Sequence, residues 1–374
     1  MTTTSPNFPT YESIGVRPLI NCMGTYTRIS GSLMLPEAKA AMMEAANAYV
    51  NLDELMDAVG TRIAELMQCE WAYVTSGCAA ALCQVTAACV AGKDPDNLKR
   101  LPDTTGMKNE VLYQPDHLHI YTHAIRMVGV QMIEVKDHDQ LESTINANTA
   151  MYAFFGDRTD RSDIPLQDVI TICRRHNVPV FVDAAAERPD VPNTYLEAGV
   201  DAVAYSGGKC LRGPQASGLV LGRKDLLQTA FSHSAPHHSL GRPMKAGKEE
   251  IMGLLAAVEQ WVTRNHDAEW QEWERRLSTI TDAVSPLPSI TTQTRQPGRS
   301  NVAPTLEVHW DQASIPLTPE AVRNQLSQGD PRIEIFTQIS LVAAIGGRGH
   351  TQNASVMRPV TAAGNRTNSF RSRS

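Results

Sequence analysis

The sequence has no apolar run that reaches the roughly 18 residues needed to cross a membrane. Its first residues also lack the basic-then-apolar pattern of a signal peptide. The seven cysteines are an odd number without a CxxC pair, which argues against a disulfide framework or a zinc site. Basic residues are not in excess, because the formal net charge is -6. We therefore expect a cytoplasmic protein with reduced thiols and with neither a membrane nor a nucleic acid as partner.

What the sequence does contain is enough apolar material for a large core. Of its 374 residues, 42% are hydrophobic and 20% are charged. Short apolar runs alternate with helical segments over the first two thirds of the chain, a pattern typical of an α/β protein whose mostly parallel sheet carries helices on both faces. We expect strands at 70–75, 110–114, 131–135, 150–155, 179–182, 202–205 and 218–221.

Composition divides the chain into five parts: an N-terminal arm (1–35), a large domain (36–245), a linking helix (246–284), a small C-terminal α/β domain (285–338) and a tail (339–374). The arm is rich in turns, and residues 92–108 are polar and are expected to form a surface loop. The tail has no acidic residue and no sustained apolar period, so we expect it to be atypical and disordered. The strand and helix that would normally close a small domain are not recognisable there.

An acid and a lysine mark the ends of two neighbouring apolar runs. Asp183 follows Phe181-Val182, and Lys209 follows Gly207 and Gly208 after the next run. Burial or nearby positive charge lowers the pKa of a lysine, which then forms an imine with an aldehyde. Each residue also has a simpler interpretation, a turn or cap for the acid and a solvated loop for the lysine. Their order and spacing together favour a joint chemical role.

A third element, Ser76-Gly77-Cys78, joins a short strand to an alanine-rich helix. A small-residue turn before a helix exposes backbone N–H groups to an anion such as a phosphate, although the same turn also serves simple packing. Pyridoxal 5'-phosphate (PLP) needs a lysine for its aldehyde, an acid for its ring nitrogen and a cup for its phosphate. The combination therefore predicts PLP as the cofactor.

Further residues are expected to complete the cofactor site. Ser206 and Arg212 are predicted to contact the phosphate, and Ala185 is small enough to lie under one face of the ring. His117 is our choice for the flat group on the other face. Metal binding by His119 and His123 is a weaker alternative, because no acidic or thiol partner has a matching spacing. We expect no metal site.

These motifs resemble the selenocysteine-synthase-like branch of fold-type I PLP enzymes, and most closely the D-glucosaminate-6-phosphate ammonia-lyase-like proteins. The resemblance is carried by residues 21–27, 75–81, 182–187, 206–215 and 241–250. It implies an aspartate-aminotransferase-like large domain, a small C-terminal domain, and a homodimer or higher homo-oligomer with sites at subunit interfaces. Two features depart from the family pattern: Cys210 stands where alanine is usual, and the chain differs from about residue 339 onward.

The resemblance also implies roles for single residues. Lys209 would form the Schiff base with the cofactor and move the α-proton of the substrate, and Asp183 would pair with the pyridinium. Contacts to an anionic substrate, or to the phosphate of a neighbouring subunit, are implied for Arg242, Lys245, Thr25 and Tyr26.

The function favoured at this point is that of a PLP-dependent lyase. It would act on a hydroxy-amino acid or an amino sugar acid by α-proton abstraction and β-elimination, with release of ammonia. A racemase, aldolase or transaminase would begin with the same lysine. A selenium transferase acting on seryl-tRNA is disfavoured by the acidic net charge. An inactive PLP-binding protein is the remaining alternative, if the unusual tail prevents closure of the site.

Overall fold

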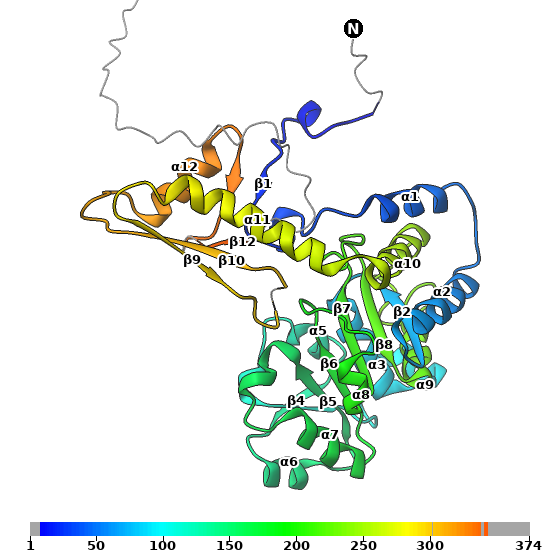
Figure 1. Cartoon of the computed structure of the whole chain (residues 1–374). Helices are drawn as coiled ribbons and strands as arrows, with labels where there is room; N and C mark the ends of the chain where they lie inside the picture. Colours follow the sequence, from blue (N-terminus) through cyan, green and yellow to red (C-terminus); the bar gives the residue numbers. More distant parts are fainter. Residues whose placement is uncertain (1–7, 301, 338–339, 343–374) are drawn as a thin grey trace, which may run out of the picture.

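A seven-stranded sheet forms the centre of the computed structural model, which describes residues 8–300, 302–337 and 340–342 (Figure 1). Its strands lie in the order β2-β8-β7-β6-β5-β3-β4. Only β8 runs antiparallel to its neighbours β2 and β7, and the other pairs are parallel. The predicted α/β fold with a mostly parallel sheet is confirmed. The strands are Trp71–Thr75 (β2), Glu110–Tyr113 (β3), Gln131–Glu134 (β4), Thr149–Phe155 (β5), Val180–Asp183 (β6), Ala202–Ser206 (β7) and Gly218–Gly222 (β8).

Helices cover the sheet, and their burial follows their sequence pattern. The alanine-rich α3 is buried almost all round because it packs on β8, β7 and β5 of the sheet and against α9. By contrast, α7 buries one side only and exposes its charged side. The helices of this region are Pro36–Ala45 (α1), Leu52–Met67 (α2), Cys78–Ala91 (α3), Pro95–Arg100 (α4), Thr122–Arg126 (α5), His138–Thr144 (α6), Leu166–Arg175 (α7), Thr194–Ala198 (α8), Lys224–Ser232 (α9) and Lys248–Thr263 (α10).

The contact between α2 and β2 depends on a glycine in the middle of the helix. A Cβ added to Gly60 would meet the backbone oxygen of Ala72 and would lie 2.8 Å from the Trp71 ring. We expect Gly60→Ala to lower the stability by about 1–3 kcal/mol, because the helix must move away from the strand. Thermal unfolding measures this loss. Gly298→Ala is the control, since its Cβ would enter open space; equal unfolding midpoints for both variants would contradict the prediction.

Two predictions about the helices need correction. The stretch 92–108, expected to be a loop, contains the short helix α4, because the Asp94 side chain accepts hydrogen bonds from the N–H groups of Asp96 and Asn97. The linking helix is two helices, α10 and His266–Val284 (α11). The break occurs where Arg264 takes an extended conformation and the side chain of Asn265 caps the new helix.

The C-terminal strands form two further small sheets. Ile290–Arg295 (β9), Thr305–Trp310 (β10) and Ser340–Val342 (β12) make a three-stranded antiparallel sheet, accompanied by the helix Pro319–Gln328 (α12). Ile333–Glu334 (β11) instead pairs in parallel with Ile20–Asn21 (β1) in the N-terminal arm. In Figure 1, α11 runs from α10 toward these strands.

These pairings correct the expectations for both ends of the chain. The arm was expected to be irregular, yet it adds a strand to β11, and the tail supplies β12 on the edge of β10. The rest of the tail, residues 343–374, lies outside the described residues. The proposed domain boundaries remain predictions.

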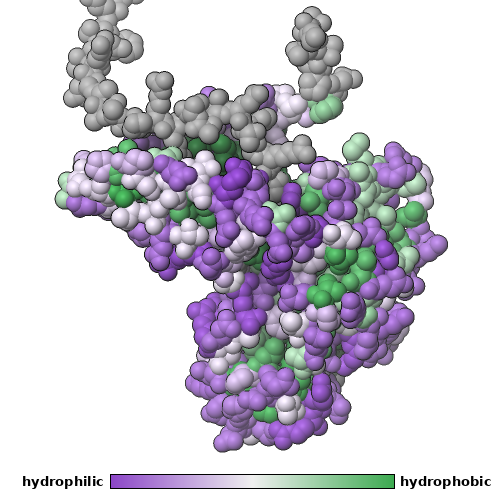
Figure 2. Space-filling model, viewed as in Figure 1, coloured by the Kyte–Doolittle hydropathy of each residue, from purple (hydrophilic) through white to green (hydrophobic). Residues whose placement is uncertain are grey.

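The surface is mixed, and hydrophilic residues dominate the face shown in Figure 2. Among the described residues, no helix combines the length and the apolar character that a membrane span requires. All seven cysteines are free thiols.

Candidate active site

Three of the predicted site elements, Asp183, Ser206 and the turn 76–78, lie at one edge of the main sheet. Asp183 ends β6 and Ser206 ends β7, so the topology brings both to the carboxyl edge of the parallel strands. Because β8 reverses direction and β2 reverses it again, Thr75 at the end of β2 returns to the same edge. Thr75 and Ser206 both pair with Gly218, from opposite sides of β8. The turn after β2 therefore faces the turn after β7.

Asp183 is buried and held by two donors. Its Oδ1 accepts a hydrogen bond from the N–H of Ala185 at 2.9 Å and from the thiol of Cys78 at 3.3 Å. Burial raises the pKa of this carboxyl, while these hydrogen bonds and the charge of Lys209 act in the opposite direction. The other oxygen, Oδ2, has no partner among the described residues. One oxygen is thus oriented by the protein and the other is available to a ligand.

Lys209 lies in the turn that follows β7. Its N–H donates to the carbonyl of Ser206 at 3.3 Å, and its ammonium has no hydrogen bond or ion pair within the described part of the chain. The two glycines before it allow the turn to pack closely against neighbouring side chains and backbone. A Cβ on Gly207 would lie 2.8 Å from Leu254, and one on Gly208 would lie 2.7 Å from the Cα of Gln215.

The turn Ser76-Gly77-Cys78 has the geometry of an anion-binding helix N-terminus. Gly77 has a φ of 92°, a conformation that favours glycine, and α3 begins at the next residue. The first N–H groups of a helix have no intrahelical partner and carry partial positive charge. Gly218 packs directly against the turn, since a Cβ there would lie 2.6 Å from the backbone of Gly77.

The contacts of His117 do not support its predicted place over the cofactor ring. Its side chain is fully buried, its Nε2 lies 2.8 Å from the Ser162 hydroxyl, and its Nδ1 accepts the N–H of Phe155. Burial lowers its pKa to about 4. His117 is thus a core residue that anchors the end of β5, with both ring nitrogens occupied.

His119, two residues later, lies nearer the site. Its ring stacks on Phe155, which is paired with Asp183 across the sheet, at a centroid distance of 5.6 Å. The charge of His119 also acts on the Asp183 carboxyl.

Arg212 is also used differently from the prediction. Its backbone has a φ of 59°, its Nε donates to the carbonyl of Leu33 at 3.3 Å, and its Nη1 lies 3.5 Å from Glu269 on α11. These contacts hold the guanidinium toward α11 and the arm, so they give no support to a phosphate contact. The approach of α11 to this turn could not be read from the local sequence.

The four residues implied by the resemblance lie in exposed or half-buried positions. Arg242 and Lys245 are exposed in the segment between α9 and α10, and Thr25 is half-buried in the arm. Tyr26 is exposed, and its ring meets Phe336 edge-on at 5.4 Å. Their roles remain predictions.

Sequence reasoning missed a buried acid beside the site, Glu187. Its Oε2 accepts a hydrogen bond from the Tyr195 hydroxyl at 2.7 Å and lies 3.9 Å from Arg299 of the segment between β9 and β10. Its Oε1 is buried without a partner among the described residues. Burial is the main cause that raises the pKa of Glu187 to about 7, and the charges of Asp157 and Asp183 act in the same direction.

The raised pKa of Glu187 makes the stability of the fold depend on pH. A carboxyl whose pKa rises on folding stabilises the fold most below its unfolded value, about 4.5, and this contribution is lost as the pH rises through about 7. The full loss of unfolding free energy is ~3 kcal/mol. We expect the unfolding midpoint of Glu187→Gln to fall less than that of the wild type between about pH 5 and about pH 8. Tyr195→Phe keeps the carboxyl but removes a hydrogen bond that lowers its pKa, so its slope should be at least as steep as that of the wild type; identical slopes in Glu187→Gln and wild type would contradict the assignment.

Comparison with known proteins places this arrangement in a family. A family model described as aminotransferase class-V matches residues 44–303. A 5'-C-glycyluridine monooxygenase-decarboxylase from Streptomyces sp is 30% identical over 336 residues, covering 86% of this chain and 83% of that protein. A D-glucosaminate-6-phosphate ammonia lyase from Salmonella typhimurium is 29% identical over 337 residues, covering 87% of this chain and 88% of that protein.

The fold agrees with this assignment. A solved structure of D-glucosaminate-6-phosphate ammonia-lyase matches with a TM-score of 0.81 and 27% identity, covering 92% of this chain and 95% of that chain. The resemblance to ammonia-lyase-like proteins is confirmed, and the fold is that of aspartate aminotransferase, PLP fold type I. With a family model that matches well over half of its length, the chain belongs to the aminotransferase class-V family.

Proposed function

We propose that this protein is a PLP-dependent lyase that acts on a hydroxy-amino acid or an amino sugar acid and releases ammonia. The observation that carries the proposal is the meeting of three elements at one sheet edge: Lys209 after β7, Asp183 at the end of β6, and the turn Ser76-Gly77-Cys78. The similarity to a D-glucosaminate-6-phosphate ammonia lyase supports an amino sugar acid as the substrate class.

The residues present fit PLP. The ammonium of Lys209 has no partner in the described structure and is available to the cofactor aldehyde. Asp183 offers one free carboxylate oxygen for a protonated ring nitrogen, and the N–H groups at the start of α3 offer a cradle for the phosphate. When bound, PLP withdraws electrons from the α-carbon of an amino acid.

The chain's own residues would then perform the remaining steps. The Lys209 amine takes the α-proton, and the hydroxyl group on the β-carbon leaves with a proton, so that one water molecule is lost. One water molecule later replaces the amino group, which yields ammonia and a 2-oxo acid. The overall change is not a redox reaction, so no further reagent is needed.

Three more assignments belong to the same proposal. His119 covers the cofactor ring in place of His117, because its ring already stacks on Phe155 beside Asp183. Ala185 lies under the other face, and Ser206 at the end of β7 reaches the phosphate. Half-burial of both residues leaves room for these contacts.

We further propose that the protein acts as a homo-oligomer. Large apolar side chains are exposed on α1 and after it, where Met43, Tyr49 and Val50 lie, and Figure 2 shows apolar residues over this region. Exposed apolar side chains of this size favour a partner surface. Arg242, Lys245, Thr25 and Tyr26 would then contact the substrate or the phosphate of the neighbouring subunit.

A second candidate function follows from the relative named a monooxygenase-decarboxylase, which is about as similar as the ammonia lyase. That reaction class consumes dioxygen and releases carbon dioxide. It would use the same lysine and acid on the same fold, because the fold alone does not select the chemistry.

One set of assays separates the two candidates. Purified protein loaded with PLP is incubated with hydroxy-amino acids and amino sugar acids, and ammonia, 2-oxo acid, dioxygen uptake and carbon dioxide are measured. We expect ammonia and 2-oxo acid in equal amounts without dioxygen uptake. Dioxygen uptake with carbon dioxide would favour the second candidate, and protein that takes up no PLP would refute both. PLP uptake without turnover of any substrate would indicate a catalytically inactive binding protein.

A further inference from the structure

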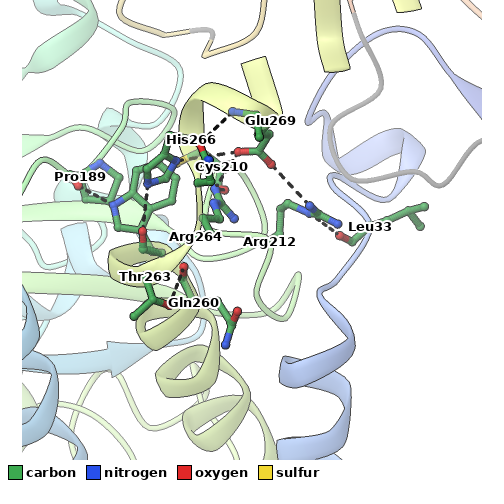
Figure 3. Close-up of polar contacts among 12 residues, drawn as sticks. Leu33, Pro189, Cys210, Arg212, Gln260, Thr263, Arg264, His266 and Glu269 are labelled. Atoms are coloured by element: carbon green, nitrogen blue, oxygen red, sulfur yellow. Dashed lines mark hydrogen bonds and ion pairs between the residues drawn. The ribbon is translucent and has the colours of Figure 1, made fainter. Parts of the chain in front are cut away.

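The turn that carries Lys209 is bonded to the junction between α10 and α11 (Figure 3). The Nη2 of Arg264, at this junction, donates to the carbonyl of Cys210, the residue after the lysine, at 2.8 Å. The Arg264 guanidinium is itself held over the ring of Trp261, 4.5 Å from the centroid. The Trp261 ring is fixed by a hydrogen bond from its Nε1 to the carbonyl of Pro189 at 2.8 Å. The junction therefore presents one rigid donor to the lysine turn.

The carboxylate of Glu269 links Arg264 to Arg212, which lies at the other end of the lysine turn. Glu269, in the first turn of α11, has its Oε2 3.4 Å from Arg264 and its Oε1 3.5 Å from Arg212. Its side chain is only 15% exposed. Removal of a largely buried carboxylate that serves two guanidinium groups is much more costly than loss of a surface ion pair. Glu269 thus connects Arg212, which directly follows Lys209-Cys210-Leu211, with Arg264, which is hydrogen-bonded to Cys210.

The N-terminal arm holds the same turn from another direction. Ser32 donates from both its N–H and its hydroxyl to the carbonyl of Gly208, at 3.1 and 2.9 Å. The N–H of Leu35 donates to the carbonyl of Arg212 at 2.9 Å, and Arg212 in turn donates to Leu33. The backbone around Lys209 is therefore fixed between the arm and α11.

Through these contacts, the orientation of α11 is linked to the position of Lys209. This helix is followed in the chain by β9 and β10 after a short connection, so its orientation helps to place the C-terminal sheet relative to the carboxyl edge of the main sheet (Figure 1). We propose that Glu269 is a positioning residue for Lys209, which couples the placement of α11 and the C-terminal sheet to the placement of the lysine amine. The inference rests on the proposed role of Lys209 as the cofactor-binding lysine.

The chain contains a matched control one turn further along α11. Glu272 also pairs with two arginines, Arg275 at 2.7 Å and Arg276 at 2.8 Å, but its side chain is 40% exposed and, within the described part of the chain, it makes no contact with the lysine turn. Glu269→Gln and Glu272→Gln therefore remove the same charge from the same helix, and each takes one shared carboxylate away from two arginines. Only the first change acts on the bonds around Lys209.

The first measurement uses the cofactor-free protein. Labelling of Lys209 by an acylating reagent, followed by mass spectrometry, is compared with labelling of Lys224, which is exposed on α9. We expect Glu269→Gln to change the ratio of the two rates by roughly 10-fold, since a small displacement alters access and reactivity strongly. Glu272→Gln should stay within about twofold of wild type. This readout does not depend on lyase activity.

The second measurement uses the PLP-loaded protein. We expect Glu269→Gln to lower kcat by roughly 10- to 100-fold, to shift the pH midpoint of the visible absorbance of lysine-bound PLP, and to be partly rescued by Glu269→Asp. Thermal unfolding establishes that each variant is folded. A folded Glu269→Gln with wild-type labelling and absorbance would overturn the inference, as would equal effects of both glutamine variants. Wild-type protein without ammonia release would refute only the proposed function, because the labelling result stands apart from it.

Discussion

Lys209→Ala is expected to abolish both the visible absorbance of bound PLP and the release of ammonia. Without the amine no covalent link to the cofactor aldehyde forms, and no base remains to take the α-proton. The loss of kcat should be at least about 10³-fold, because general acid–base catalysis by a positioned group alone contributes 10² to 10⁴. Absorbance spectra of purified protein and an ammonia assay measure the two effects.

Lys224→Ala is the matched control for this prediction. Lys224 is exposed at the start of α9 and distant in the fold from the carboxyl edge of β6 and β7. We expect it to leave the spectrum and the rate at wild-type values. A Lys209→Ala variant that keeps the visible absorbance would show that another amine binds the cofactor.

Asp183→Asn should reduce kcat by roughly 10²- to 10³-fold while PLP still binds, because the neutral amide no longer stabilises a positive charge on the ring nitrogen. The geometry supports a large effect. Asp183 is buried, its Oδ1 is held by Ala185 and Cys78, and its Oδ2 is the oxygen left for the ligand. Rate measurements and the absorbance maximum of the bound cofactor together report the loss.

Asp201→Asn provides the comparison for the second prediction. Asp201 lies just before β7 at the opposite edge of the sheet, where it accepts the N–H of Val180 and pairs with Arg223. Its loss should lower the unfolding temperature and leave kcat unchanged. If Asp183→Asn and Asp201→Asn reduced kcat equally, the role of Asp183 would be structural rather than electrostatic.

Much of the main sheet could be predicted because its strands are short apolar runs separated by helices with a clear period. For the same reason Asp183 and Lys209 could be placed at one edge, since parallel strands share a carboxyl end. The arm and the tail escaped prediction for the opposite reason. The pairing of Ile20 with Ile333 joins the arm to the small C-terminal domain, and only this tertiary contact makes a strand of residues 20–21.

The candidate site shows the same division between what local sequence specifies and what the fold adds. The lysine, the acid, the glycine turn and the cofactor class followed from the sequence, because each needs a particular residue type next to a strand end. The choice between His117 and His119 depended on side-chain direction, which sends the first ring into the core and the second toward Phe155. The use of Arg212, and its link through Glu269 to α11, depended on how a distant helix packs on the lysine turn. Local pattern thus determined which chemistry the protein carries, and long-range packing decided which side chains reach it.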